Sequence, residues 1–153
     1  MRIRFIRARE TWPLRHRVLR PHQELEDCDF PNDRNPDSFH LGAFEQDELV
    51  GIASFYAERN EQVKGWKQYR LRGMAVAPEL QGRGIGRKLV LVALDHLEAR
   101  HADSLWCNAR TRAAEFYGTL GFTSVGEPFD IPGIGEHYVM SRQVLLPAPP
   151  AGG

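Results

Sequence analysis

The stretch of sequence that decides the fold is Arg72-Gly73-Met74-Ala75-Val76-Ala77-Pro78-Glu79-Leu80-Gln81-Gly82-Arg83-Gly84-Ile85-Gly86-Arg87. A strand-like run ends at Pro78, a short loop rich in glycine and arginine follows, and an amphipathic helix begins at about Ile85. The N-terminus of a helix carries roughly half a positive charge together with unpaired N–H donors, so it favours a phosphate group. Glycines let the backbone approach an anion because no Cβ stands in the way. We interpret the segment as a pyrophosphate cradle, with Arg83 and Arg87 as candidate phosphate-binding side chains.

Two common phosphate-binding motifs do not fit this segment. The P-loop string G-x-x-x-x-G-K-[ST] does not occur in the chain. The dinucleotide fingerprint G-x-G-x-x-G has the wrong spacing, because Gly82, Gly84 and Gly86 alternate and lie in the middle of the chain. The string Gln81-Gly82-Arg83-Gly84-Ile85-Gly86 instead resembles the Q/R-x-x-G-x-G/A signature of the GCN5-related N-acetyltransferase (GNAT) family, whose loop holds the pyrophosphate of acetyl-CoA.

Two further motifs extend this resemblance. The run Met74-Ala75-Val76-Ala77-Pro78 is similar to the Met/Leu-Ala-Val-x-Pro strand end that precedes the signature in the family. The run Phe116-Tyr117-Gly118-Thr119-Leu120-Gly121-Phe122 is similar to a later FY…LGF segment. The clear match covers residues 71–122, whereas the first 65 residues match only in their pattern of elements.

Hydrophobic patterns along the chain predict an α+β fold. Alternating or continuous apolar runs predict strands at residues 1–7, 39–44, 49–57, 66–77, 104–108, 122–125 and 137–144. Helical spacing predicts helices at 85–100, with Ile85, Leu89, Ala93 and Leu97 one turn apart, at 111–120, and at 11–20 with Thr11 as the N-cap. Residues 28–37 and 127–136 are predicted loops. The resemblance implies α/β/α layers around a mixed, mostly antiparallel sheet that is splayed at its middle.

Length and composition predict one domain over residues 1–146 and a flexible tail at 147–153. The formal net charge of the 153 residues is zero, which argues against nucleic acid as a partner. The sequence contains no run of 18 apolar residues, so no membrane span is predicted. Cys28 and Cys107 form neither a disulfide framework nor a metal motif, so we expect no metal and a cytoplasmic location. The N-terminal arginines either lie on solvated faces or bind the coenzyme's 3′-phosphate or an acidic acceptor; they are Arg2, Arg4, Arg7, Arg9, Arg15, Arg17 and Arg20.

The resemblance also implies a direct reaction with acetyl-CoA as cosubstrate and no protein nucleophile. The absence of a G-x-S-x-G motif agrees with this expectation. The pantetheine arm is expected to pair with the backbone of the strand that contains Met74, Ala75 and Val76, and a free N–H near Met74 is expected to polarise the acetyl carbonyl. Asn108 is expected to bond the same arm. The full expected coenzyme site is Met74, Ala75, Val76, Gln81, Gly82, Arg83, Gly84, Ile85, Gly86, Arg87, Asn108 and Phe116.

Tyr117 is the expected general acid that protonates the leaving CoA thiolate, because a tyrosine stands at this point of the family's FY motif. The general base stays open between Glu58, Glu136, His137 and a chain of waters, with His137 suited to titrate near neutral pH. A Gly-Ile…His…Met ending around His137 resembles a segment that lines the acceptor side in some members, and Arg72 and Tyr69 are further acceptor-side candidates.

The sequence does not identify the acceptor, which is expected to be a small amine or a peptide. A homodimer is possible, since dimers are common in the family. The alternative to an enzyme is a non-catalytic acyl-CoA-binding or regulatory module on the same fold, which has no need to keep Tyr117.

Overall fold

The computed structural model describes residues 1–145, which form one seven-stranded sheet with the strand order β1-β2-β3-β4-β5-β7-β6. The strands are β1 (Arg2–Ile6), β2 (Phe39–Glu45), β3 (Glu48–Ala57), β4 (Gln68–Val76), β5 (Ser104–Arg110), β6 (Thr123–Ile131) and β7 (Gly135–Gln143). Only β4 and β5 pair in parallel, and every other neighbouring pair is antiparallel. The predicted mixed, mostly antiparallel sheet is confirmed.

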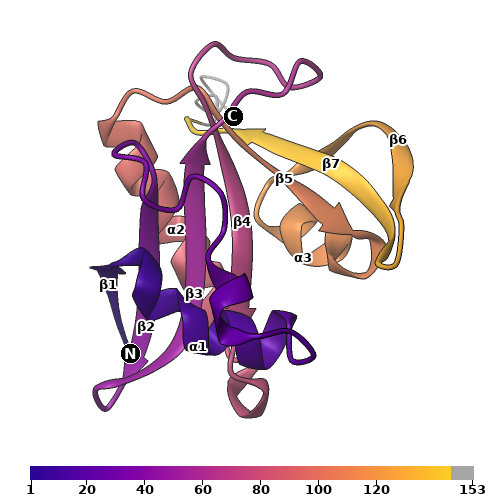
Figure 1. Ribbon diagram of the computed structural model, residues 1–153. Helices are drawn as coiled ribbons and strands as arrows, with labels where there is room; N and C mark the ends of the chain where they lie inside the picture. The colour runs from indigo at the N-terminus through magenta and orange to yellow at the C-terminus, as the bar shows by residue number, and fades with distance from the viewer. Residues whose placement is uncertain (146–153) are drawn as a thin grey trace.

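Helices cover both faces of the sheet. Helix α2 (Ile85–Ala99) packs behind β2, β3 and β4, and a helical segment near the N-terminus crosses their opposite face (Figure 1). That segment comprises η1 (Ala8–Thr11), α1 (Trp12–Leu14) and the π-helical turn η2 (Arg15–Leu19). The remaining helical elements are η3 (Leu25–Cys28), η4 (Pro78–Leu80), η5 (Thr111–Ala113) and α3 (Ala114–Thr119). No helix within residues 1–145 is long and apolar enough to cross a membrane.

The sheet splays between β4 and β5, as predicted. The parallel pairing joins only three residues of each strand, from Gln68 opposite Ser104 to Arg70 opposite Trp106. Beyond this point β5 turns away with β7 and β6, which form a separate wing of the sheet (Figure 1). Within residues 1–145, positions 71–76 of β4 therefore have no strand partner on this edge.

A β-bulge lies on β4 at this free edge. Arg72 pairs with Ser54 and Ala75 pairs with Ile52, so Gly73 and Met74 together stand opposite the single residue Ala53. Gly73 has a φ of 66°, a left-handed conformation that glycine adopts without the steric cost of a side chain. The bulge re-aims the strand just before Met74.

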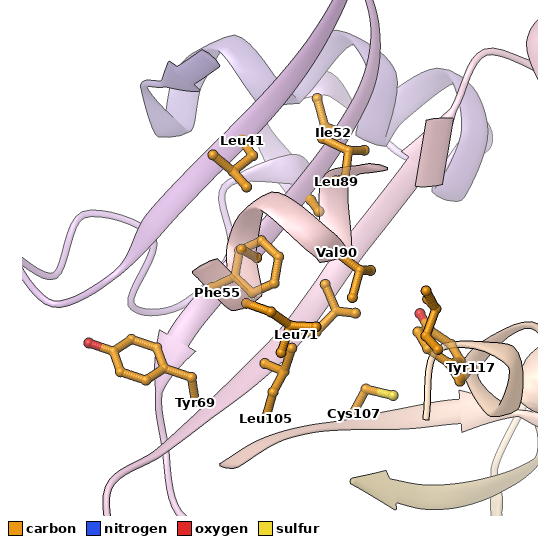
Figure 2. Close-up of a cluster of buried hydrophobic side chains, with 14 of the residues drawn as sticks. Leu41, Ile52, Phe55, Tyr69, Leu71, Leu89, Val90, Leu105, Cys107 and Tyr117 are labelled. Carbon is orange, nitrogen blue, oxygen red and sulfur yellow. The ribbon is translucent and has the colours of Figure 1, made fainter. Parts of the chain in front are cut away.

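The core lies between α2 and the sheet. The four residues of the predicted helical stripe, Ile85, Leu89, Ala93 and Leu97, are buried, and so are Val90 and Leu94 beside them. They pack against side chains of β2, β3 and β4 such as Leu41, Ile52 and Phe55 (Figure 2). The amphipathic pattern thus positions the N-terminus of α2 against the end of β4.

Two predicted features of the chain differ from the structure. The predicted loop 127–136 is mostly strand, because β6 continues to Ile131 through a register shift between Val125 and Phe129 that contains Pro128. Since β6 is an edge strand, the missing N–H of Pro128 does not break the sheet. Thr11 stands at the N-cap position of α1, but its side chain does not cap the helix: helical structure already begins at Ala8, and the Thr11 hydroxyl donates back to the Ala8 carbonyl oxygen at 2.5 Å. The predicted tail 147–153 lies outside the described residues, and the domain limits stay a prediction.

Candidate active site

Two cavities meet where β4 and β5 diverge. The first, of about 600 Å³, lies over the glycine-rich loop, and we call it the glycine-loop cavity. The second, of about 550 Å³, lies between β4, β5 and the N-terminal helical segment, and we call it the arginine cavity. Both are lined by Val18, Met74, Ala113 and Tyr117, so they join at these four side chains.

The glycine-loop cavity ends at the N-terminus of α2. Gly84 is the N-cap residue of α2 with a φ of 81°, no side chain caps the helix, and its first turn contains no acidic residue. The unpaired N–H groups of that turn are thus available to an anion. A Cβ on Gly86 would stand 3.3 Å from the Phe116 ring and 3.6 Å from the Met74 sulfur. Glycine at this position therefore leaves the part of the cavity between Phe116 and Met74 open.

Most of the predicted coenzyme residues line this one cavity. They are Met74, Ala75, Val76, Gln81, Gly82, Gly84, Ile85, Gly86, Arg87 and Phe116. The Gln81 side-chain amide also donates to the Val76 carbonyl oxygen at 3.2 Å, which ties the loop to the end of β4. Two predicted residues lie elsewhere: Arg83 is exposed on the loop and does not line the cavity, and Asn108 lines the arginine cavity.

Tyr117 stands at the junction of the two cavities. Its ring packs edge-to-face against Phe116 and Phe122, with centroid separations of 5.1 and 5.4 Å. Burial, reinforced by the neighbouring Cys107, raises the pKa of Tyr117 above its usual range, so the phenol keeps its proton at neutral pH. Figure 2 shows Tyr117 at the margin of the buried hydrophobic cluster, beside Cys107. The protonated Tyr117 side chain therefore borders both cavities.

Cys107 is the other reactive side-chain type near the junction. It is buried at the wall of the arginine cavity, and this burial raises the pKa of its thiol to about 12. A cysteine acts as a nucleophile through its thiolate, which is negligible at neutral pH for such a thiol. The site therefore fits a reaction without a cysteine acyl-enzyme.

The arginine cavity is lined by five arginines and one histidine, which are Arg20, Arg70, Arg72, Arg110, Arg112 and His137. The His137 side chain is buried, and its Nδ1 lies 2.8 Å from the Gly135 carbonyl oxygen. A carbonyl oxygen only accepts, so Nδ1 carries the hydrogen, and Nε2 of the neutral ring keeps a free lone pair. His137 therefore has the tautomer of a proton acceptor.

The other two candidate bases and Tyr69 do not line either cavity. The Glu58 carboxylate accepts a hydrogen bond from Arg70 at 3.1 Å, and the exposed Glu136 carboxylate accepts one from the Thr111 hydroxyl at 3.0 Å. Tyr69 is buried in the main core, and its hydroxyl accepts a hydrogen bond from Arg100 at 2.8 Å. Residues 1–145 contain no cluster of three or more side chains that could hold a metal ion.

Sequence analysis missed a buried ion-pair network beneath the arginine cavity. Arg15 is fully buried and donates to Asp33 at 2.5 Å, to the Cys28 carbonyl oxygen at 2.8 Å and to the Ser54 hydroxyl at 2.8 Å. Burial opposes ionisation of Asp33, but the hydrogen bonds from Arg15, Tyr56 and the Phe30 N–H outweigh it and lower the pKa. Neither predicted role of the N-terminal arginines applies to Arg15.

One feature of the sequence does point to the buried position of Arg15. It lies on the same helical stripe as Leu14 and Val18, four residues after Thr11, where an apolar residue is expected. The Arg15 guanidinium also stands 4.0 Å from the Phe30 ring centroid, so the network supports Phe30 as part of the cavity wall.

Comparison with known proteins agrees with this geometry. The sequence model of the Acetyltransferase (GNAT) family matches residues 5–122. A Bacillus subtilis (strain 168) protein named uncharacterized N-acetyltransferase YitI is 40% identical over 142 residues, which cover 93% of this chain and 95% of that protein.

Solved structures of acetyltransferases share the fold. An aminoglycoside 6′-N-acetyltransferase complexed with coenzyme A superposes with a TM-score of 0.77 at 16% identity, covering 98% of this chain and all (100%) of that chain. The ribosomal-protein-S18-alanine N-acetyltransferase from Escherichia coli superposes with a TM-score of 0.74 at 17% identity, covering 96% of each chain. The chain therefore belongs to the GNAT family, whose members transfer an acetyl group from acetyl-CoA to an amine, and it is an N-acetyltransferase.

Proposed function

We propose that the protein transfers the acetyl group of acetyl-CoA directly to an amine while both substrates are bound. Acetyl-CoA occupies the glycine-loop cavity, and the amine occupies the arginine cavity. The observation that carries the proposal is the junction of the two cavities at Met74 and Tyr117, beside the free edge of β4. One substrate on each side of that junction brings the amine nitrogen to the thioester without a covalent enzyme intermediate.

The proposed coenzyme site uses backbone more than side chains. The pyrophosphate lies on the uncapped first turn of α2, with Arg87 beside it and Arg83 on the exposed loop. The pantetheine amides pair with the free edge of β4 at residues 74–76, and Phe116 and Ile85 form the apolar wall of the cavity. Asn108 reaches the arm from the far side of the splay.

The chemistry moves one proton from nitrogen to sulfur. The neutral amine attacks the thioester carbonyl carbon, and the Met74 N–H stabilises the oxygen as it gains negative charge, a contribution of about 3–4 kcal/mol in measured oxyanion sites. The nitrogen loses a proton, the carbon–sulfur bond breaks, and the Tyr117 hydroxyl donates a proton to the CoA thiolate. Because burial raises its pKa, the Tyr117 phenol keeps its proton at neutral pH and donates it as negative charge builds up on the sulfur.

His137 is the proposed acceptor of the proton that leaves the amine. It is the one candidate base among Glu58, Glu136 and His137 that lines the arginine cavity. Its Nε2 lone pair is free in the neutral ring because Nδ1 is held by the Gly135 carbonyl oxygen. A homodimer and a cytoplasmic location stay predictions from the sequence.

The variant Tyr117→Phe tests the proposal most simply. We expect kcat to fall about a hundredfold or more, the usual contribution of a general acid, while the Kd for acetyl-CoA changes little. Turnover is measured with the best amine from a panel of amino acids, amino sugars and polyamines, and Kd by calorimetric titration.

Tyr138→Phe is the matched control, because Tyr138 is a tyrosine on β7 that lines neither cavity. It should leave both kcat and Kd unchanged. If Tyr117→Phe turns over as fast as the parent protein, Tyr117 is not the acid.

A further inference from the structure

We propose that the amine acceptor carries an anionic group, a carboxylate or a phosphate, which binds to Arg72 on the wall that Arg72, Arg20 and Phe30 form in the arginine cavity. The inference rests on the proposed function, in that the arginine cavity is the acceptor site. It goes further because it names the chemical class of the acceptor.

The arginine cavity as a whole is positively charged. Five arginines line the cavity, and none of its lining residues within the described chain is Asp or Glu. Among the five arginines that line the cavity, only Arg70 has a carboxylate partner in residues 1–145, since its guanidinium lies 3.1 Å from Glu58. Arg20 donates to neutral groups, the Gln23 amide oxygen at 3.3 Å and the Asp27 carbonyl oxygen at 3.1 Å. The cavity therefore holds positive charge that the fold does not balance.

Arg72 and Arg20 converge on one aromatic ring. Their guanidinium carbons lie 4.7 and 4.5 Å from the centroid of the buried Phe30 ring. A guanidinium that stacks on a ring keeps its N–H groups free at the edge, where they match the oxygens of a carboxylate or phosphate. The arrangement is already formed without a ligand, so little side-chain entropy is lost when an anion binds.

Arg72 is an unfavourable place for a cation without an anion. Burial, followed by the nearby charges of Arg70 and Arg20, lowers the pKa of the Arg72 guanidinium. A bound anion relieves both effects, because it pairs with the buried charge and screens it from its neighbours. A polycation at the same place would add to the repulsion, so the cavity selects against amines such as polyamines.

The position of Arg72 fits a small acceptor. Arg72 precedes Met74 by two residues on β4, which is roughly 7 Å along a strand and somewhat less across the bulge at Gly73. Arg72 and Met74 line the same cavity, so one small acceptor spans the distance between the anion site and the reacting centre. The cavity volume of about 550 Å³ also falls within the usual range for small-molecule sites, about 300–1,000 Å³.

Matched pairs of amines test the inference by binding alone. The protein is saturated with CoA, which cannot transfer an acetyl group, and is titrated calorimetrically with the common α-amino acids and their carboxamides. A second pair, glucosamine 6-phosphate and glucosamine, distinguishes phosphate from carboxylate, and spermidine is the cationic probe. We expect the member that carries the carboxylate or phosphate to bind roughly tenfold or more tightly than the partner without it, and spermidine not to bind.

Three variants assign the effect to Arg72. Arg72→Met should remove most of the preference for the anionic member, and Arg72→Lys should restore part of it because the charge returns without the planar fork. Arg59→Met is the matched control: Arg59 also stacks on a ring, 4.3 Å from the centroid of Trp66, but lies outside both cavities. It should leave the preference unchanged.

The inference is overturned if the amines without a carboxylate or phosphate, or spermidine, bind as tightly as the amines that carry one, or if Arg72→Met keeps the preference. It is also overturned if no anionic amine binds to protein that does bind acetyl-CoA, a result that leaves the proposed function standing. Failure to bind acetyl-CoA itself would remove the proposed function as well, so the two failures are distinct.

Discussion

The two cavities of the site are built in opposite ways. The glycine-loop cavity is formed mainly by one continuous segment, residues 74–87, and it presents backbone groups and a helix N-terminus. The arginine cavity is formed by side chains from the N-terminal helical segment, the loop around Phe30, β4, β5 and the β6–β7 hairpin. A site made of continuous backbone leaves a motif in the sequence, whereas a site assembled from distant side chains leaves only scattered residues.

The greatest loss of stability is expected when the buried Arg15–Asp33 ion pair beneath the arginine cavity is broken. Arg15→Met leaves the buried Asp33 carboxylate without its ion-pair partner, which should cost about 3–5 kcal/mol in the free energy of unfolding. Urea denaturation measures the change.

Arg17→Met is its control on the same helical segment. Arg17 pairs with Glu79 at 2.7 Å, but both side chains are about half exposed (53% and 58%), so the loss should stay below about 1 kcal/mol. Equal losses for the two variants would show that the buried Arg15–Asp33 pair contributes no more to stability than the exposed Arg17–Glu79 pair.

The second effect concerns the base. His137→Asn should lower kcat/KM about a hundredfold near neutral pH, because no group in the cavity then takes the proton from the amine. The deficit should shrink as pH rises, because hydroxide then takes the proton that His137 accepts from the attacking nitrogen. A pH profile of kcat/KM for both proteins checks this. A deficit that is constant with pH would instead indicate a role for His137 in packing.

The third effect concerns the glycine-loop cavity. Gly86→Leu fills the passage beside Phe116 and Met74, and overpacking of about 1–3 kcal/mol should weaken acetyl-CoA binding by roughly tenfold to a hundredfold. Gly118→Leu is the control, because a Cβ at this helical glycine meets nothing within 4 Å. Calorimetric titration gives both Kd values, and equal values would place the coenzyme elsewhere.

The same contrast explains how much the sequence could predict. The α2 stripe and the residues of the glycine loop follow from local patterns, namely a helical period and an anion-binding helix start, whereas the splay follows only from the family resemblance. The Arg15–Asp33 pair joins residues 18 positions apart, and no local pattern specifies such a contact. The bulge at Gly73 and the continuation of β6 past Pro128 depend on which strands are neighbours, and a single sequence does not state this.

The last prediction concerns how the free energy of unfolding depends on pH, and we expect it to be the smallest change. It involves His40, which belongs to the buried network. Its Nε2 donates to the Asp33 carbonyl oxygen at 2.9 Å, and its Nδ1 lies 2.7 Å from the Ser54 hydroxyl. Burial lowers the pKa of His40, although Asp33 opposes the shift. The unfolded chain therefore binds a proton more readily, and the free energy of unfolding should fall as pH drops below the usual histidine pKa, about 6.5.

Urea denaturation at pH 7.5 and 5.5 measures this loss. It should be smaller in His40→Gln than in the parent protein, whereas the exposed His22→Gln should match the parent. A His40→Gln protein that loses as much stability as the parent would assign the pH dependence to other groups.

Direct transfer requires that acetyl-CoA and the amine are bound at the same time, on the two sides of Met74 and Tyr117, when the acetyl group moves. Initial velocities measured while acetyl-CoA and the amine are varied in turn test it most directly. We expect double-reciprocal lines that intersect, which is the pattern of a ternary complex. Parallel lines, the pattern of a covalent acetyl-enzyme, would contradict direct transfer between the cavities.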